Sequence, residues 1–519
     1  MTTEPAIADP KVSSPPSTAG MTAKVVKGSA WTLAGQVLPV AVSLLTAPFV
    51  IRFLGSERYG VLVLVGLIPS YFAFADLGMG FASTKFASEA YSEGDSKREA
   101  ETVWTAASIA VMSSSLVAVP ILLFSGLIVS ALNVPDHLHS TASIALKIST
   151  ITYLLAVLSS VLNTPQLSRL RMDLNTAVNI IPKIVFMIAI PVLLYFGSGI
   201  IAAVTALLCA AAATTLGHIL VSGRLQPMLF RVRWNPALAR PLFKFAGGWL
   251  FAAIAAVLLM NTEKLMLTRL VSVQTLAHYS VAFTFASVAA LFSGSMLQSL
   301  LPAFSQLLVP EKKDQYEQLF TRTMRLNIAW VLPALMILII MARPFFTLWA
   351  GEEFGRESTG PFYILIVGLF FNMLAFIPNS TILAAGRTSA LAKLYWIELA
   401  LYIPLMLGLI YFFGILGAAA AWSARVTFDM FLIMWLARRN QGVTFAFLSR
   451  IPVLLIGVAS LAIPVAIAMM YDNFSLLLIP VAIISLGIYS TVAWGKFLEP
   501  AERDRVLGFI RNLRYRFAS

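Results

Sequence analysis

Ionisable side chains inside long apolar runs are the residues of this chain best suited to chemistry. A charge at the centre of a membrane helix is unfavourable by about 2.5–3.5 kcal/mol, so it usually faces a cavity or a partner. Arg425 and Asp429 are four residues apart on one helical face and can pair, either at a working site or only to fix helix packing. Lys393 and Glu398 are about 140° apart around a helix and are expected to meet other partners. The candidates inside apolar runs are Asp76, Lys183, Glu263, Lys264, Lys393, Glu398, Arg425 and Asp429.

Two of these positions suggest contact with a phosphate. Lys183 lies near the middle of its run with no acid nearby in sequence, so it is expected to meet a pyrophosphate or a carboxylate from another helix. Glu263 and Lys264 lie toward one end of a run that also contains Arg269. Arg269 suits snorkelling at a membrane interface. Glu263 beside Lys264 predicts either the same behaviour or a cavity site where the acid titrates and the base holds phosphate.

The composition indicates the environment that must position these residues. Of the 519 residues, 59% are hydrophobic and 12% are charged. Soluble domains contain about 45–50% apolar and about 25% charged residues. Four histidines and one cysteine, Cys209, argue against a structural metal site and allow no internal disulfide. No G-x-x-x-x-G-K-[ST] segment occurs, so the chain cannot hydrolyse ATP by the P-loop route.

The apolar residues form uninterrupted runs of about 20 residues, the length that crosses a bilayer as a helix. They do not alternate with polar residues as the strands of a β-barrel would. The pattern predicts an all-α polytopic membrane protein with about 14 transmembrane helices. These are expected at 29–53, 59–82, 103–131, 142–162, 174–196, 199–222, 244–269, 276–301, 326–350, 361–384, 390–413, 415–437, 451–470 and 474–495.

The basic residues are distributed unequally between the two sides of this predicted membrane protein. With the N-terminus inside, 28 Lys and Arg fall on the cytoplasmic side and 7 on the other. This bias places both termini in the cytoplasm. It also explains the formal charge of +13 without nucleic acid as a partner. The loops are too short for a catalytic domain, so the chain is not expected to be an enzyme, and any work must use a gradient, a partner or the solute's own energy.

The two halves of the chain repeat each other at offsets of 216–220 residues. Asn163-Thr164-Pro165 with Arg171 corresponds to Asn379-Ser380-Thr381 with Arg387. Because six helices is an even number, the repeats insert in the same orientation. The sequence therefore predicts two six-helix lobes related by a pseudo-two-fold axis along the membrane normal, with a cleft between them and two additional C-terminal helices.

Several motifs carry a family resemblance that covers residues 24–495. They are Gly28-Ser29-Ala30-Trp31, Pro48 to Gly55 with Arg52, Tyr59-Gly60, Asp76-Leu77-Gly78-Met79-Gly80, and Asn261-Thr262-Glu263-Lys264-Leu265 followed by Tyr279. These residues resemble the polysaccharide transport proteins, the Wzx-type flippases of the multidrug/oligosaccharidyl-lipid/polysaccharide (MOP) exporter superfamily. One departure is Ser280, which stands where the first half has Gly60.

The resemblance implies a function and a location. The cargo would be an undecaprenyl-diphosphate-linked oligosaccharide, moved to the outer leaflet of a bacterial inner membrane by alternating access for exopolysaccharide, O-antigen or capsule synthesis. The partners would be the bilayer, a polysaccharide polymerase and a chain-length regulator. No cofactor is expected, and coupling to a proton or sodium gradient is left open. Two alternatives within the superfamily are a lipid II-type flippase and a multidrug or metabolite exporter.

The predicted organisation has six parts. Residues 1–23 form a disordered cytoplasmic tail, 24–223 the N-lobe, 224–243 a cytoplasmic linker, 244–438 the C-lobe, 439–496 the last two spans and 497–519 a basic amphipathic tail. The residues expected to line a substrate cavity are Arg52, Asp76, Lys183, Glu263, Lys264, Arg269, Lys393, Arg425 and Asp429.

Overall fold

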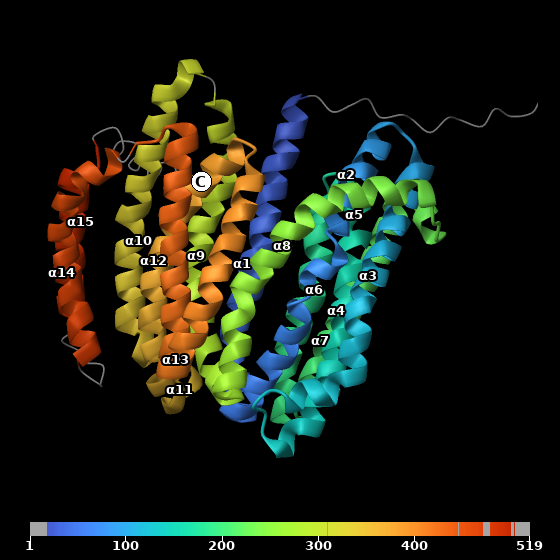
Figure 1. The fold of residues 1–519 in the computed structure, drawn as a ribbon, viewed down its shortest axis with the longest axis horizontal. Coiled ribbons are helices and arrows are strands. Elements are labelled where there is room, and N and C mark those ends of the chain that lie inside the picture. The colour runs from blue at the N-terminus through green and yellow to red at the C-terminus, as the bar shows by residue number, and fades with distance from the viewer. Residues whose placement is uncertain (1–17, 309, 445, 471–477, 500–502, 504–519) are drawn as a thin grey trace, which may run out of the picture.

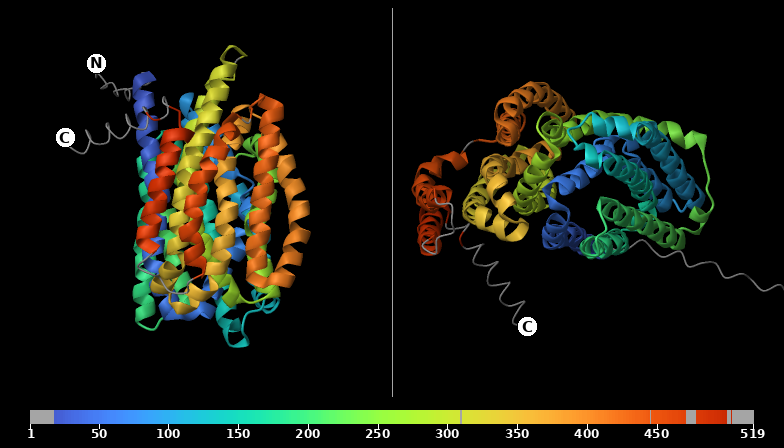
Figure 2. Two further views of the ribbon diagram at one scale, coloured as in Figure 1. Left: turned by 90° about the vertical axis from the view of Figure 1, so that its left-hand side faces the viewer. Right: turned by 90° about the horizontal axis from the view of Figure 1, so that it is seen from below.

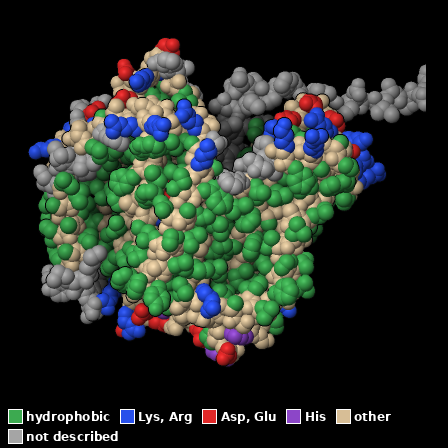
Figure 3. Space-filling view, viewed as in Figure 1, with side chains coloured by type: hydrophobic (Ala, Val, Ile, Leu, Met, Phe, Trp, Pro, Cys, Tyr) green, Lys and Arg blue, Asp and Glu red, His purple; other side chains and the backbone are tan. Residues whose placement is uncertain are grey.

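The structure is a computed structural model that describes residues 18–308, 310–444, 446–470, 478–499 and 503. Regular structure in these ranges is helical throughout, as expected where a backbone must satisfy its own hydrogen bonds in hydrocarbon. Within the same ranges, eight helices are long and apolar enough to cross a membrane. On the face in Figure 3, apolar side chains cover the middle, and Lys and Arg gather along the upper edge.

The helices form two groups (Figure 1). The first comprises α1 (Thr18–Ser70), α2 (Met79–Ser92), α3 (Ser96–Ser130), α4 (His139–Leu162), α5 (Thr164–Ser168), α6 (Met172–Tyr195) and α7 (Ile200–Leu225). The second comprises α8 (Pro236–Leu270), α9 (Val273–Gln306), α10 (Lys313–Ala350), α11 (Glu352–Glu357), α12 (Thr359–Ala384), α13 (Thr388–Gln441), α14 (Ile451–Met470) and α15 (Leu478–Val492).

The two longest helices, α1 and α13, are hairpins. Each contains one glycine with a positive φ, Gly55 at 78° and Gly414 at 54°, a conformation that side chains with a Cβ rarely adopt. The reversal in α13 brings its two ends together, and Arg387 Nη1 donates to Asn440 Oδ1 at 2.6 Å. Gly414 falls between the predicted spans 390–413 and 415–437.

The predicted span 59–82 is interrupted, which the apolar pattern did not indicate. α1 ends at Ser70, a 3-10 turn covers Ala73–Asp76, and helix resumes at Met79. Leu77 and Gly78 have φ values of 56° and 66°. The Asp76 carboxylate accepts a hydrogen bond from the Gly78 amide at 2.8 Å, which stabilises this break.

Helices also extend into regions that were expected to be loops or tails. The chain between the predicted spans 59–82 and 103–131 is mostly α2 and α3, and α8 already begins at Pro236, where the Asn235 side chain caps the helix. Residues 18–23, expected in the disordered tail, begin α1. The rest of that tail, and all of the basic tail after Glu499 except Arg503, lie outside the described residues.

Each group has its own apolar core. Leu64, Leu146 and Val204 pack together in the first group. Phe346 and Phe362 belong to a core in the second. The view from below in Figure 2 shows the two sets of helices side by side. The two cores are not fully separate, because α1 and α9 each contribute residues to the core of the other group as well as to their own.

The groups meet at the end of the bundle that carries α11, called here the α11 end; the opposite end is the α2 end (Figure 1). At the α11 end, Gln274 Nε2 donates to Ser56 Oγ at 3.2 Å and to Glu353 Oε1 at 2.7 Å. Gly60 lies so close to α9 that a Cβ there would be 2.1 Å from the Val273 carbonyl oxygen. These contacts hold the first and second groups together at the α11 end.

Candidate functional site

A cluster of buried ionisable groups lies between α8 and α13. Glu263 of α8 is fully buried, and Tyr402 of α13 donates a hydrogen bond to its Oε2 at 3.2 Å. The other carboxylate oxygen, Oε1, has no hydrogen-bond partner among the described residues. Tyr279 of α9 is also fully buried, and its hydroxyl has no partner in the described part of the chain either. An acid and a phenol with unused hydrogen-bonding capacity therefore lie in an apolar core.

The α13 hairpin adds three more charges to this cluster. Glu398 lies on the first segment of the hairpin, and Arg425 and Asp429 lie on the second. Arg425 Nη1 is 3.7 Å from Glu398 Oε2, and the guanidinium lies over the Tyr402 ring at 5.6 Å. Tyr402 thus links Arg425 to Glu263. We call Glu263, Glu398, Tyr402, Arg425 and Asp429 the buried acid cluster.

Helical spacing suggested that Arg425 pairs with Asp429, but the α13 hairpin gives Arg425 a different partner. The ion pair of Arg425 is with Glu398, which is closer because the reversal at Gly414 places the two α13 segments side by side. Asp429 Oδ1 has no hydrogen-bond partner among the described residues. Glu398 was expected to find a partner other than Lys393, and this is confirmed.

The cluster contains three buried carboxyl groups and one guanidinium. Burying an ionised carboxylate without a partner is strongly unfavourable. The three acids can therefore not all be ionised unless another positive charge joins them. The chemistry available to the cluster is uptake and release of a proton or a small cation, with Arg425 balancing one negative charge.

Lys264 follows Glu263 in sequence but lies in different surroundings. Its Nζ is 4.5 Å from the centre of the Phe283 ring on α9. Phe283 packs edge-on against Trp422 at 5.3 Å and near Tyr279 at 6.0 Å. Successive helix residues point about 100° apart. The Lys264 ammonium therefore lies against the Phe283 ring on α9, and whether it acts together with Glu263 stays a prediction.

The remaining predicted residues lie elsewhere. Arg52 donates to the Leu348 carbonyl at 2.8 Å, and the Arg269 carbonyl accepts from Asn133 at 3.0 Å, both at the α11 end. Lys183 is exposed on α6 and Lys393 is exposed on α13. Asp76 binds its own chain. The structure brings together Glu263, Arg425 and Asp429 from the predicted set, with Glu398.

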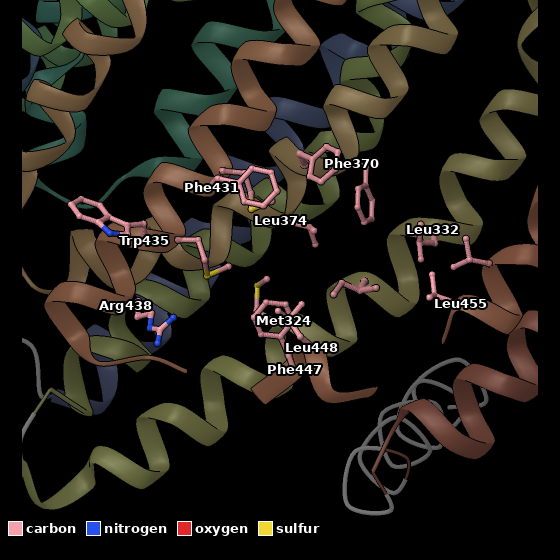
Figure 4. A pocket seen from close by; sticks show the side chains of 15 residues that line it. Met324, Leu332, Phe370, Leu374, Phe431, Trp435, Arg438, Phe447, Leu448 and Leu455 are labelled. Atoms are coloured by element: carbon pink, nitrogen blue, oxygen red, sulfur yellow. The ribbon is translucent and has the colours of Figure 1, made fainter. Parts of the chain in front are cut away.

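Two components of the site were missed by sequence reasoning. Tyr402 stands four residues after Glu398 on the same helical face, a spacing that could have indicated its role. The other component is an apolar groove with a volume of about 560 Å³ between α10, α12, α13 and α14 (Figure 4). The residues that line the groove come from several separate segments of the chain, so no single segment of the sequence indicates it. Its lining comprises Met324, Ile328, Leu332, Phe370, Phe371, Leu374, Met430, Phe431, Met434, Trp435, Arg438, Phe447, Leu448, Leu455 and Val458.

The groove is apolar along its length, and one of its described lining residues is charged. This residue is Arg438, in the last turn of α13, which lies at one edge beside Trp435 (Figure 4). Phe370 and Phe431 lie near each other on another part of the wall. A long apolar chain with an anionic head group is the kind of ligand that matches this arrangement.

A family model described as "Polysaccharide biosynthesis protein" matches residues 49–358, more than half of the chain. The chain belongs to this family. A Shigella flexneri protein with the curated name "Putative O-antigen transporter" is 25% identical over 424 residues, which cover 80% of this chain and 98% of that protein. The "Uncharacterized membrane protein EpsK" of Bacillus subtilis is 21% identical, over 67% of this chain and 69% of its own.

Solved structures show the same fold at low identity. The lipid II flippase MurJ, in an inward closed conformation, has a TM-score of 0.63 at 13% identity and covers 90% of this chain and 99% of its own. A mutant of the Vibrio cholerae MATE transporter VcmN has a TM-score of 0.59 at 16% identity, with 82% and 97% covered. This polysaccharide biosynthesis protein is therefore a multi-pass membrane protein with a MATE- and MurJ-like fold, and its family is one of transporters and not of enzymes.

Proposed function

We propose that the chain is a flippase for lipid-linked oligosaccharides. It would move an oligosaccharide on undecaprenyl diphosphate from the cytoplasmic to the outer leaflet of a bacterial inner membrane, for cell-surface polysaccharide synthesis. The observation that carries this proposal is the apolar groove with Arg438 at its edge (Figure 4), in a member of the polysaccharide biosynthesis family. The groove suits a polyprenyl chain, and a guanidinium suits a phosphate.

The proposed architecture has fourteen membrane crossings in two six-helix lobes, residues 24–223 and 244–438, plus α14 and α15. Helix starts in the two halves support it. Ser96 of α3 and Lys313 of α10 are 217 residues apart, and His139 of α4 and Thr359 of α12 are 220 apart. These offsets match those of the sequence repeat. A pseudo-two-fold axis along the membrane normal would relate the lobes.

The proposed orientation places the α2 end in the cytoplasm, with both termini. Lys and Arg gather at this end in Figure 3, as the inner side of a membrane protein requires. The α11 end, which Gln274, Ser56 and Glu353 hold closed, would then face outward. In this state the cargo would enter from the cytoplasm, and release would require those contacts to open.

The buried acid cluster would couple transport to a proton or sodium gradient. It lies in the second group, close to α9, whose first turn contacts α1 at the α11 end. A change in the charge of Glu263 would alter how α8 packs against α13, and α8 also connects the two groups. A polysaccharide polymerase and a chain-length regulator would receive the exported units.

A lipid II-type flippase is the second candidate, because the fold of MurJ covers 90% of this chain. Lipid II and lipid-linked oligosaccharides share a polyprenyl diphosphate, so the groove suits both. A drug or metabolite exporter fits less well, because α14 forms one wall of a groove that a small cargo does not need.

Transport in proteoliposomes tests the proposal. Vesicles with the purified protein receive labelled undecaprenyl-diphosphate oligosaccharide or lipid II, and flipped lipid is measured by its accessibility to an external glycosidase. Faster flipping of the oligosaccharide lipid supports the proposal. Faster flipping of lipid II alone would replace it with the second candidate, and flipping of neither would refute both.

Two leucine variants connect the groove to this activity. Leu455 lines the groove and is 56% exposed, whereas Leu220 of α7 is 46% exposed and lies outside the groove. Leu455→Trp should slow flipping several-fold because the indole occupies the groove, and Leu220→Trp should leave it unchanged. Equal rates for the two variants would mean that the groove does not hold the lipid.

A further inference from the structure

A second, polar pocket lies at the α2 end of the second group, away from the apolar groove. Its volume is about 360 Å³, and it forms where the ends of α9, α10, α12 and α13 converge. The α13 hairpin contributes both of its ends, joined by the hydrogen bond from Arg387 to Asn440. We call this the α13-end pocket.

The α13-end pocket is positively charged. Lys313 and Arg387 line it, and none of its described lining residues is an acid. Of the acids close to Lys313 in sequence, Asp314 and Glu317 line a different cavity, and Glu311 is exposed and does not line the pocket. Glu317 also accepts a hydrogen bond from Thr444. Two cations without an acid in one small pocket form a site for an anion.

The two cations, Lys313 and Arg387, both lie beside the residues at the C-terminal end of α13. Arg387 binds the Asn440 side chain, and Lys313 reaches Gly442, where an added Cβ would be 3.9 Å from the lysine Nζ. They could serve merely to offset the negative C-terminal end of α13. However, the Arg387 bond is to the side-chain oxygen of Asn440 and not to a main-chain carbonyl, and the Gly442 amide already binds the Arg438 carbonyl.

Uncharged polar groups in the pocket also have unused hydrogen-bonding capacity. Both side-chain polar atoms of Gln441 are inaccessible to solvent and have no hydrogen-bond partner among the described residues. Arg387 is also the N-cap residue of α13, and its own side chain does not cap the helix, so amide groups of the first turn remain beside Arg387. Helix amides, an amide side chain and two cations are groups that together recognise phosphate.

We propose that the α13-end pocket binds a phosphate group at the membrane surface. Neither the family match nor the cargo proposal assigns a role to this pocket. The phosphate could belong to a lipid-linked diphosphate arriving from the cytoplasmic leaflet, or to the head group of an anionic phospholipid. In either case Lys313 and Arg387 contact the phosphate oxygens, and Gln441 donates its amide hydrogens.

Inorganic diphosphate titrated into the purified full-length protein tests the site. Arg387→Gln and Lys313→Gln should each weaken binding about tenfold, because each removes one charge-assisted contact. Lys312→Gln is the matched control, since it removes an adjacent lysine that does not line the pocket. Equal affinities for all three variants and the unmodified protein would overturn the proposal. The two pocket variants are independent, so one that folds poorly, judged by gel filtration, leaves the other decisive.

A competition experiment identifies the source of the phosphate. The protein is placed in phosphatidylcholine nanodiscs that contain either undecaprenyl diphosphate or phosphatidylglycerol, and diphosphate binding is measured again. Loss of binding with the first supports a cargo-loading site, and loss with the second supports a head-group site. Unchanged binding in both would show that no lipid phosphate occupies the pocket. No transport is measured here, so this result and the flipping assay can fail independently.

Discussion

Two sites in this molecule contain buried carboxylates, and they differ in how completely hydrogen bonds and positive charges compensate the negative charge. In the first group, Glu99 of α3 is fully buried and binds Arg169 through both oxygens, at 2.5 and 3.1 Å, and accepts from Gln226 at 2.6 Å. Arg169 also lies over the Tyr91 ring at 4.3 Å. In the buried acid cluster of the second group, Glu263 and Asp429 each have an oxygen without a partner among the described residues.

From this difference we infer that the charge of Glu99 serves to hold the structure together, whereas the charge of the buried acid cluster can be exchanged. Glu99 has a guanidinium and an amide within hydrogen-bond distance, and this network ties α3 to the end of α5 and to the segment before α8. The buried acid cluster has three acids and one guanidinium, and we propose that its charge changes during a transport cycle. Substitutions at the first site should therefore alter stability, and substitutions at the second should alter transport.

The largest expected effect is on stability, at Glu99. Glu99→Ala leaves the Arg169 guanidinium, only 14% exposed, without its counter-charge. Breaking such a pair on one side destabilises a protein by about 3–5 kcal/mol. Thermal unfolding of the purified protein should show a clear fall in Tm. Glu89→Ala, which removes an exposed partner of Lys85, is the control and should change Tm little. A similar Tm for both variants would mean that the Glu99 network is not structural.

The second prediction concerns Glu263, where stability and transport should separate. Glu263→Gln keeps the size of the side chain and an oxygen for the Tyr402 hydroxyl, so stability should change by less than about 1 kcal/mol. Flipping should fall on the order of tenfold or more, because an amide cannot exchange a proton. Flipping assays and Tm on the same preparation measure both. Full activity in Glu263→Gln would remove this acid from the mechanism, and full activity in Lys264→Ala as well would remove the whole predicted pair.

The sequence predicted much of the fold and less of the site, for physical reasons. Apolar runs located the long helices, because hydrophobic length is a local property. The break at Leu77 was missed, because a left-handed leucine depends on tertiary packing around Asp76. Arg425 was paired with Asp429 by helical spacing, whereas the contact with Glu398 exists only because the hairpin folds back. The groove comes from several helices, so no periodicity in one segment could reveal it.

A third prediction tests the link within the cluster. Tyr402→Phe removes the hydroxyl that donates to Glu263 and leaves the ring under Arg425. One hydrogen bond contributes about 0.5–1.5 kcal/mol, so flipping should change several-fold, less than for Glu263→Gln. Tyr411→Phe, an exposed tyrosine on the same helix, is the control. If the Tyr402→Phe change persists in a Glu263→Gln background, the hydroxyl acts on something other than Glu263.

The smallest effect is expected at the exposed contacts of the α11 end. Glu353 of α11 lies outside the long helices. Partial burial raises the pKa of its carboxyl, but hydrogen bonds from Gln274 and Ser56 and the proximity of His278 outweigh burial and lower the pKa below its usual 4.5. Because the folded-state pKa is the lower one, the stabilisation that ionised Glu353 gives to the closed α11 end is complete above pH 4.5. It is lost as the pH falls through the folded-state pKa.

The α11 end should therefore stay closed from about pH 8 down to about pH 5 and loosen only in stronger acid. Glu353→Gln should weaken closure by less than about 1 kcal/mol, as for other exposed pairs. Spin labels at Asp136→Cys and Glu352→Cys, in a Cys209→Ser background, report the separation of the two groups across this pH range. If the labels move apart within that range, a group other than Glu353 controls closure. Movement in the same range that vanishes in Glu263→Gln would assign that control to the buried acid cluster, and would connect the exchangeable charge directly to opening of the α11 end.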